Sequence, residues 1–425
     1  MKNLLIISFD FIREGESETS LAIGSILSYI KNDIDYGIKF KASHLPINVL
    51  EFNENFEVSD LNKYLSNYNF NEIDYIAISA YVWNEFITNS FINLIINKYN
   101  FTGKVILGGY QISYSNNPVL EYPNCHYFID GYAENALLSI LKNENNSKVL
   151  KSNFDFSNIP SPYLTDEIQV DDNQEKVRVE TQRGCPYRCN FCAHRDLTNN
   201  KVYKQSFEKT ISEFKYFRYK KVEKVNVLDP IFNIGSNYLN ILNELVKMNY
   251  KSLISIQVRF ETIIGDKGLR FLDLCEKLNI HLEFGLQTAI IKESILINRK
   301  NNPSKIKSVM HQLNKRNISY EVSLIYGLPT QTVTSFKKSI SFLIENGCEK
   351  IIAFPLMLLK GTELFQEKEK FSLKEENIGE YNIPLVTSSN SFSKNNWLEM
   401  KKIANNLKLS NKNENRIKLP LTIDA

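Results

Sequence analysis

The chain has 425 residues, of which 43% are hydrophobic and 23% are charged. This composition is close to the average of globular proteins, so the chain can bury a sizeable core, and its length suggests two or three domains. The 51 Lys and Arg residues nearly balance the 48 Asp and Glu residues, which leaves a formal net charge of +3. Such a balance argues against a protein that binds nucleic acid or a charged membrane surface.

The apolar segments of the sequence are too short for a membrane span or a secretion signal. The longest, Ile351 to Leu359, contains Pro355 and falls far short of the ~20 residues that cross a bilayer. Near the start only Leu4 to Ile7 form an apolar run, whereas a secretion signal needs about 7 to 15 such residues. We therefore expect a cytoplasmic protein.

Short apolar runs alternate with helical patterns over residues 1–147, which predicts a doubly wound parallel α/β domain. The first run, Leu4 to Ser8, is too short to be anything but a buried strand. Apolar residues then recur with the helical period from Ile23 to Ile30. Further strands are expected at 47–52, 75–79, 104–107 and 127–130, and helices at 85–99 and 134–141.

The remainder of the chain divides into three parts. Residues 148–176 are polar, carry two prolines and lack a sustained period, so we expect a linker. Residues 177–360 show six successive βα units, which predicts a partial barrel with its chemistry at the carboxyl ends of the strands. Residues 361–425 are expected to cover the barrel, with a helix near 398–407. The barrel strands are expected at 177–181, 224–228, 253–258, 281–286, 320–325 and 350–354.

The six cysteines are distributed unevenly. Three of them, Cys185, Cys189 and Cys192, fall within eight residues just after the first expected barrel strand. Three thiolates at this spacing can surround a compact metal centre, and cubane iron-sulfur clusters are normally held by cysteines. Three ligands leave one iron open, and an open position is what a catalytic metal centre requires. The other three are expected to be small buried hydrophobic residues, namely Cys125, Cys275 and Cys348.

Two other readings of the three clustered cysteines remain open. A zinc site could recruit His194 as its fourth ligand, although structural zinc usually takes its ligands as two separated pairs. Alternatively, two of the cysteines could be a redox pair and the third a bystander, but the segment lacks a thioredoxin-like context. Spacing and placement together favour the iron-sulfur cluster.

The segment resembles the signature of the radical S-adenosylmethionine (SAM) superfamily, Cys-x-x-x-Cys-x-x-Cys with an aromatic residue, here Phe191, before the third Cys. The resemblance implies that Cys185, Cys189 and Cys192 bind three irons of a 4Fe-4S cluster and that SAM chelates the fourth. It also implies that Phe191 packs near the adenine and that reductive cleavage of SAM gives a 5'-deoxyadenosyl radical. The cofactor then carries the difficult chemistry, and the protein directs it.

The resemblance continues along the expected barrel, in the branch of the superfamily that carries a cobalamin domain. It implies that Asp229 and Asn233 lie near the SAM amino group and that Gln287 faces the ribose. Arg259 corresponds to the charged end of the third barrel strand, and Gln331 to a loop that contacts the adenine. At 323 this chain has Ser where relatives often carry Asp, so we expect at most a water-mediated contact there.

Residues 1–147 resemble the cobalamin-binding domain of that branch. Gly108, Gly109 and Gly131 would let the backbone approach a corrin, although ordinary tight turns would also explain them. The Asp-x-His-x-x-Gly motif that supplies an axial histidine to cobalt is absent, so Trp83 or Tyr81 would cover that face. The domain could also have kept the fold and lost the cofactor.

The sequence therefore predicts a radical SAM enzyme that uses a 4Fe-4S cluster, SAM and cobalamin. The expected reaction is methyl transfer to an unactivated carbon of a specialised metabolite or peptide, with electrons from a donor such as flavodoxin or ferredoxin. One rival is a cobalamin-independent rearrangement, cross-link or oxidation, and another is a metal-stabilised binding module. A methylthiotransferase is disfavoured, because the amino-terminal region lacks three cysteines for a second cluster.

Overall fold

The structure is a computed structural model that describes residues 1–53, 55–144, 147–152, 155–194, 201–235, 237–379 and 382–412. The chain forms two compact units. Unit 1 comprises Met1–Val177 and Asn377–Pro384, and unit 2 comprises Arg178–Glu376 and the chain from Leu385 onward. The expected linker, 148–176, lies within unit 1. Among the described residues, the helices are all too short or too polar to span a bilayer.

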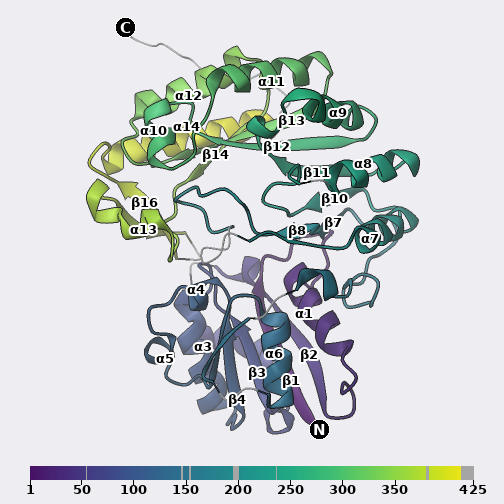
Figure 1. Ribbon diagram of the computed structural model, residues 1–425. Coiled ribbons are helices and arrows are strands. Elements are labelled where there is room, and N and C mark those ends of the chain that lie inside the picture. The colour runs from purple at the N-terminus through teal and green to yellow at the C-terminus, as the bar shows by residue number, and fades with distance from the viewer. Residues whose placement is uncertain are drawn as a thin grey trace. The chain divides into compact units, whose positions relative to one another are not determined.

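Unit 1 contains a six-stranded parallel sheet in the order β2-β1-β3-β4-β5-β6. This is a doubly wound arrangement, and the strand order reverses between β1 and β3, where such sheets bind ligands. The predicted class of this domain is therefore confirmed (Figure 1). Its strands are β1 (Lys2–Asp10), β2 (Phe40–Asn48), β3 (Tyr75–Ser79), β4 (Lys104–Gly108), β5 (Tyr127–Asp130) and β6 (Val149–Lys151).

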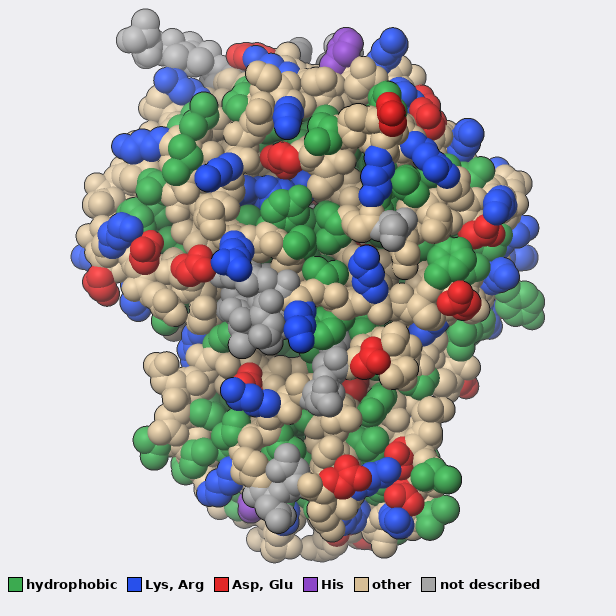
Figure 2. Space-filling model, viewed as in Figure 1, with side chains coloured by type: hydrophobic (Ala, Val, Ile, Leu, Met, Phe, Trp, Pro, Cys, Tyr) green, Lys and Arg blue, Asp and Glu red, His purple; other side chains and the backbone are tan. Residues whose placement is uncertain are grey.

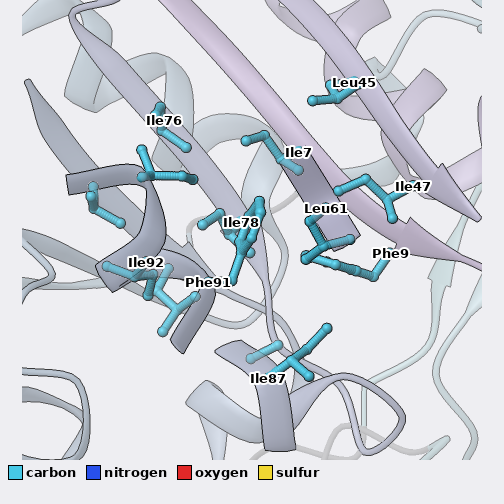
Figure 3. Packing of buried hydrophobic residues seen from close by; sticks show 14 of the residues in the cluster. Ile7, Phe9, Leu45, Ile47, Leu61, Ile76, Ile78, Ile87, Phe91 and Ile92 are labelled. Carbon is cyan, nitrogen blue, oxygen red and sulfur yellow. The ribbon is translucent and has the colours of Figure 1, made fainter. Parts of the chain in front are cut away.

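Helices cover both faces of this sheet because its strands are apolar on both sides. Helices α1 (Leu21–Lys31) and α6 (Ala133–Lys142) pack on one face, against a core that includes Leu4 and Ile6. Helix α3 (Glu85–Lys98) packs on the other face, where Phe91 and Ile92 meet Ile7, Phe9 and Ile78 (Figure 3). The short helices of this unit are α2 (Asn62–Leu65), α4 (Tyr110–Ser113) and α5 (Pro118–Glu121).

The second strand lies earlier in the chain than the sequence predicted. The expected strand, 47–52, overlaps β2 by only two residues, and Val49–Glu51 is a 3₁₀ helix whose first turn is capped by the Asn48 side chain. Strand β2 is at the edge of the sheet, and polar residues, among them Lys41 and Ser43, separate buried Phe40 from buried Leu45 and Ile47. This interruption makes an edge strand less conspicuous than the continuous apolar runs of the central strands.

The second sheet has six strands in the order β14-β13-β12-β11-β10-β7, which follows the chain, and β10 to β14 pair in parallel. This confirms the predicted partial barrel. Along β12 the buried Leu282, Phe284 and Leu286 alternate with Glu283, Gly285 and Gln287, which share the other face. The strands are β7 (Lys176–Val179), β10 (Lys224–Val227), β11 (Leu253–Val258), β12 (Ile280–Gln287), β13 (Ser319–Tyr326) and β14 (Ile351–Pro355).

Helices alternate with these strands in unit 2 (Figure 1). The start of α11 was expected from its sequence, because Asn302 and Pro303 suit an N-cap and a first helical position. In the structure the Asn302 side chain accepts a hydrogen bond from the Lys305 backbone at 3.1 Å. The helices are α7 (Phe207–Tyr219), α8 (Asn237–Lys247), α9 (Gly265–Cys275), α10 (Ile291–Leu296), α11 (Pro303–Lys315) and α12 (Val333–Glu345).

The end of the described chain packs onto the last barrel strands. After the short helix α13 (Glu363–Gln366), strands β15 (Lys374–Ile378) and β16 (Ile383–Ser388) form a small sheet. Helix α14 (Lys394–Lys412) then packs against β13, β14 and α12 and buries Trp397, whose ring centroid lies 5.9 Å from that of Tyr326. On the face shown in Figure 2, Lys and Arg side chains are mixed with Asp and Glu, as the balanced composition suggests.

Candidate functional site

The three clustered cysteines lie on one loop beyond the carboxyl end of β7. The loop begins at β8 (Gln182–Arg183), which pairs antiparallel with β9 (Tyr203–Lys204). Cys185 and Cys189 are buried, and Cys192 is partly exposed. The fold therefore gathers three thiols from eight residues at the barrel edge where chemistry is expected.

Burial raises the pKa of the Cys185 thiol, and it raises that of Cys192 to about 11. The guanidinium groups of Arg259 and Arg299 act in the opposite direction on Cys185. The free thiols of Cys185 and Cys192 are thus protonated near pH 7, and an iron that binds them must displace their protons. The three sulfur donors fit a sulfur-ligated cluster. The negative charge of buried thiolates would be compensated by the positive charges of the two nearby guanidinium groups.

His194, the alternative zinc ligand, contacts the cysteines through its backbone. Its N–H lies 3.5 Å from the Cys192 Sγ, and its side chain is exposed. In the described part of the chain, no three His, Cys, Asp or Glu residues form a group that could hold one metal ion. A cubane makes a different demand, because each cysteine binds a separate iron.

The segment after α10 holds the cysteine loop in place. The Asn190 backbone N–H donates to the Ile297 carbonyl at 3.2 Å, and its side-chain amide donates to the Leu296 carbonyl at 2.7 Å. The Asn298 amide in turn donates to the Arg188 carbonyl at 2.7 Å. These contacts join positions more than 100 residues apart, so the sequence contains no local signal for them.

Arg299, which the sequence analysis did not single out, contacts a cluster cysteine directly. Its Nη1 lies 3.7 Å from the Cys189 Sγ, and its Nη2 donates to the Gly285 carbonyl on β12. Gln287 folds over the same glycine, because a Cβ at Gly285 would lie 2.6 Å from the Gln287 Nε2. Gln287 also has a positive φ of 71° at a β-bulge. Gly285 is thus contacted by Gln287 and Arg299, and Arg299 in turn reaches Cys189.

Arg259 also faces the cysteine loop. Its side chain is buried, its Nε donates to the Glu261 carboxylate at 3.2 Å, and its guanidinium lies 3.8 Å from the ring centroid of Tyr187. Tyr187 is two residues after Cys185, so this cation–π contact packs Arg259 against the loop. Arg259 directly follows β11, so the structure places it at the carboxyl end of that strand.

Gln331 and Asn233, two other predicted SAM contacts, have different surroundings. Gln331 is fully buried, with its Oε1 accepting from the Gly327 and Leu328 N–H groups and its Nε2 donating to the Ile325 carbonyl at 3.0 Å. These bonds hold the turn after β13. Asn233 donates to Thr262 Oγ1 at 2.6 Å, and its Oδ1 is buried without a partner among the described residues, so it remains available to an amino group.

Asp229 is committed to the start of the cysteine loop. Its carboxylate accepts hydrogen bonds from the backbone N–H groups of Thr181 at 2.7 Å and Gln182 at 3.1 Å, and from the Thr181 hydroxyl. Asp229 therefore orients the cysteine loop through the backbone of that loop.

Two further positions were singled out by the sequence. Phe191 is partly exposed, and the Ser323 hydroxyl donates to the Phe284 carbonyl at 3.3 Å.

We expect the stability of the protein to fall between about pH 4 and pH 7 because of Asp229. Burial raises the pKa of its carboxyl from 3.8 to about 7 and outweighs the opposing hydrogen bonds. Between pH ~4 and ~7 the folded chain therefore keeps a proton that the unfolded chain has lost. The contribution of Asp229 to the free energy of unfolding is fully present below pH ~4, where both states are protonated. About three pKa units correspond to at most about 4 kcal/mol, lost as the pH rises through ~7.

Asp229→Asn mimics the protonated acid, so its free energy of unfolding should lack this decline in denaturant titrations from pH 4 to 8. The matched control is Asp273→Asn, which changes an exposed carboxylate of the same unit and should keep the wild-type slope. Parallel pH profiles for the wild type and Asp229→Asn would contradict the prediction.

In unit 1, the predicted cobalamin residues lie at the carboxyl ends of neighbouring strands. Trp83 follows β3, its ring stacks on Tyr81 at a centroid distance of 4.6 Å, and its Nε1 donates to the Phe9 carbonyl of β1 at 2.8 Å. Gly108 ends β4, and Gly131 directly follows β5. These residues therefore gather along the edge of the sheet that includes the switch point between β1 and β3.

The structural reasons for glycine differ among the three glycines at this edge. Gly109 has a φ of +93°, and a Cβ there would lie 2.6 Å from the Ala80 carbonyl oxygen, so the turn itself requires glycine. Gly108 has an ordinary φ, and a Cβ there would meet only Ile129 at 3.5 Å. Gly131 has a φ of +98°, and its N–H donates to Ser113 Oγ at 2.9 Å. Tight-turn geometry thus explains Gly109 without a ligand.

An open parallel barrel whose first strand leads into a Cys-x-x-x-Cys-x-x-Cys loop defines a class of protein. Residues 179–343 match the family model of the Radical SAM superfamily. This part of the chain is a radical SAM domain, as the motif predicted.

The chain is also similar to individual cobalamin-dependent radical SAM proteins. The chain is 27% identical over 201 residues to the cobalamin-dependent radical SAM methyltransferase TokK of Streptomyces tokunonensis. The aligned region covers 44% of this chain but only 29% of TokK. The TsrM methyltransferase of Kitasatospora setae, solved with tryptophan and a SAM analogue, aligns with a TM-score of 0.70 at 12% identity over 99% of this chain and 92% of that one. OxsB, a cobalamin-dependent SAM radical enzyme, aligns with a TM-score of 0.69 at 12% identity. This alignment covers 97% of this chain and 67% of OxsB. The fold of this chain is therefore that of cobalamin-dependent radical SAM enzymes.

Proposed function

We propose that this protein is a cobalamin-dependent radical SAM methyltransferase that methylates an unactivated carbon of a small molecule or peptide. The observation that carries the proposal is the loop of Cys185, Cys189 and Cys192, which lies beside two guanidinium groups at the carboxyl edge of a radical SAM domain. The two-unit fold, which aligns over nearly the whole chain with TsrM and OxsB, supports the cobalamin part.

In this proposal the cysteine loop holds a 4Fe-4S cluster through three thiolates. When bound, the cluster would supply the electron that cleaves SAM to methionine and a 5'-deoxyadenosyl radical, and cobalamin would carry the methyl group. The chain provides Asn233 Oδ1 as a buried acceptor for the SAM amino group. Asp229 accepts from the backbone at the start of the cysteine loop, and the Asn190 side chain within the loop donates to the Leu296 carbonyl, so both keep the loop in one position. Such fixed placement is what brings reacting atoms within about 3 to 3.5 Å.

Unit 1 would bind cobalamin at the carboxyl edge of its sheet. Trp83 and Tyr81 form a rigid stacked pair there, because the Trp83 indole is also fixed to the β1 backbone. An aromatic surface offers no nitrogen ligand to cobalt. We therefore expect bound cobalamin without coordination by a protein nitrogen, a state that favours loss of its methyl group. Electrons would come from a reduced flavodoxin or ferredoxin.

The test is to reconstitute the protein anaerobically with iron and sulfide, add hydroxocobalamin, remove the excess, and measure cobalt, iron and absorbance. We expect about one cobalt and four irons per chain. Cys189→Ala is the matched control, since it alters only unit 2 and should lose iron while it retains cobalt. Wild-type protein that holds iron but no cobalt would contradict the methyltransferase and favour cobalamin-independent radical chemistry. Stoichiometric zinc without iron would favour a metal-stabilised binding module.

A further inference from the structure

Helix α10 lies beside the cysteine loop and exposes two large apolar side chains. The carbonyls of its last residue, Leu296, and of Ile297 accept hydrogen bonds from Asn190 at 2.7 and 3.2 Å. Asn190 directly follows a cysteine of the motif, so the end of the helix holds the loop. Ile291 and Ile295 are four residues apart, on the same side of the helix, and each is 56% exposed. The helix that contacts the cysteine loop therefore presents an apolar pair to solvent.

Three positively charged side chains belong to the same surface. Lys292 lies on α10, and Lys300 follows it. Arg188 of the cysteine loop is joined to this segment, because the Asn298 amide donates to its carbonyl at 2.7 Å. All three charged side chains are exposed, and none of them forms an ion pair or a side-chain hydrogen bond with another described residue. We call this set the α10 surface: Arg188, Ile291, Lys292, Ile295 and Lys300.

The segment that forms most of the α10 surface adds no exposed negative charge. Glu293 is the one acidic residue from 287 to 302, and its side chain is buried, with a carboxylate oxygen that accepts from the Thr288 hydroxyl at 2.5 Å. Burial raises the pKa of this carboxyl, which disfavours its negative form. The α10 surface is therefore positive, although the whole chain carries a formal charge of only +3.

An apolar centre with charged residues around it is typical of a surface that binds another protein. Transient electron-transfer complexes use small interfaces, with less than about 1,200 Å² buried in total, so a short helix and its neighbours can supply one side. Complementary charge speeds the association of such partners and excludes wrong ones. A positive surface of this kind selects an acidic partner.

We propose that the α10 surface is the docking site of a small, acidic one-electron carrier protein that reduces the cluster. One electron leaves the carrier, which is oxidised, and enters the cluster, which is reduced, and no atom or proton is transferred. The route is short, because Asn190, to which the end of α10 is bonded, adjoins Cys189 in the chain. This inference rests on the proposed function, because it requires the cluster.

The experiment measures the formation of 5'-deoxyadenosine from SAM by the anaerobically reconstituted protein. The reductant is either reduced flavodoxin, an acidic one-electron carrier, or titanium(III) citrate, a small molecule that needs no docking surface. The α10 variants are Ile295→Glu and Lys292→Glu. Leu269→Glu and Lys277→Glu are matched controls, since both residues are exposed in the same unit, on α9 and just after it. Iron is assayed in every variant.

With iron retained, we expect each α10 variant to raise the KM for flavodoxin about tenfold, which corresponds to about 1.4 kcal/mol of binding, and to keep the wild-type rate with titanium. The controls should match the wild type with both reductants. An unchanged KM for flavodoxin in both α10 variants would overturn the inference. Equal losses with both reductants, loss of iron in both variants, or a wild type that only titanium reduces would overturn it as well. A wild type that cleaves no SAM even with titanium would instead refute the proposed function.

Discussion

Cys189→Ala is expected to lower the iron content from about four per chain to background and to abolish the reductive cleavage of SAM, because one iron of the cubane loses its protein ligand. The same result is expected for Cys185→Ala and Cys192→Ala, since the three thiols share one loop. Iron and sulfide assays, together with the yield of 5'-deoxyadenosine under anaerobic reducing conditions, measure the effect.

The control substitutions for this prediction are Cys275→Ala and Cys348→Ala. Both cysteines are buried away from the motif, and burial raises the pKa of both thiols, that of Cys348 to about 12. They should behave as small apolar core residues, and their replacement should leave iron binding unchanged. Loss of iron in either control would mean that the cluster ligands are wrongly assigned.

Gly184→Ala is expected to have the second large effect, although it removes no ligand. Gly184 directly precedes Cys185 and has a φ of +86°, and a Cβ there would collide with the backbone carbonyl oxygen of Lys201. Strain of this kind costs about 1 to 3 kcal/mol, and the backbone clash must in addition displace the loop. We expect lower stability and a cluster content well below that of the wild type.

Gly265→Ala separates these two causes. Gly265 also has a positive φ, +60°, but a Cβ there would have nothing within 4 Å. This variant should lose only about 1 kcal/mol of unfolding free energy and keep its iron. Denaturant unfolding and iron assays on both variants provide the comparison. Equal losses of stability and normal iron in both would show that the approach to Lys201 is unimportant.

The architecture was largely predictable because its strands carry strong local signals. Each central strand is a short apolar run between polar turns, so the expected barrel strands 253–258 and 320–325 lie within a residue or so of β11 and β13. The edge strand β2 was misplaced, because polar residues such as Lys41, Ser43 and His44 interrupt its buried residues, so it lacks the continuous apolar run of the central strands.

For the site, the sequence by itself determined which side chains are available as ligands, since three thiols within eight residues must lie near one another whatever the rest of the chain does. It also placed Asp229 and Gln331 close to strand ends. Only the tertiary structure decided that both are bonded to the backbone of turns, because a side chain at a strand end can face either a ligand or its own loop. Only the tertiary structure likewise brought Arg299 to Cys189, 110 residues away, because that contact depends on how β12 and the segment after α10 pack around the cysteine loop.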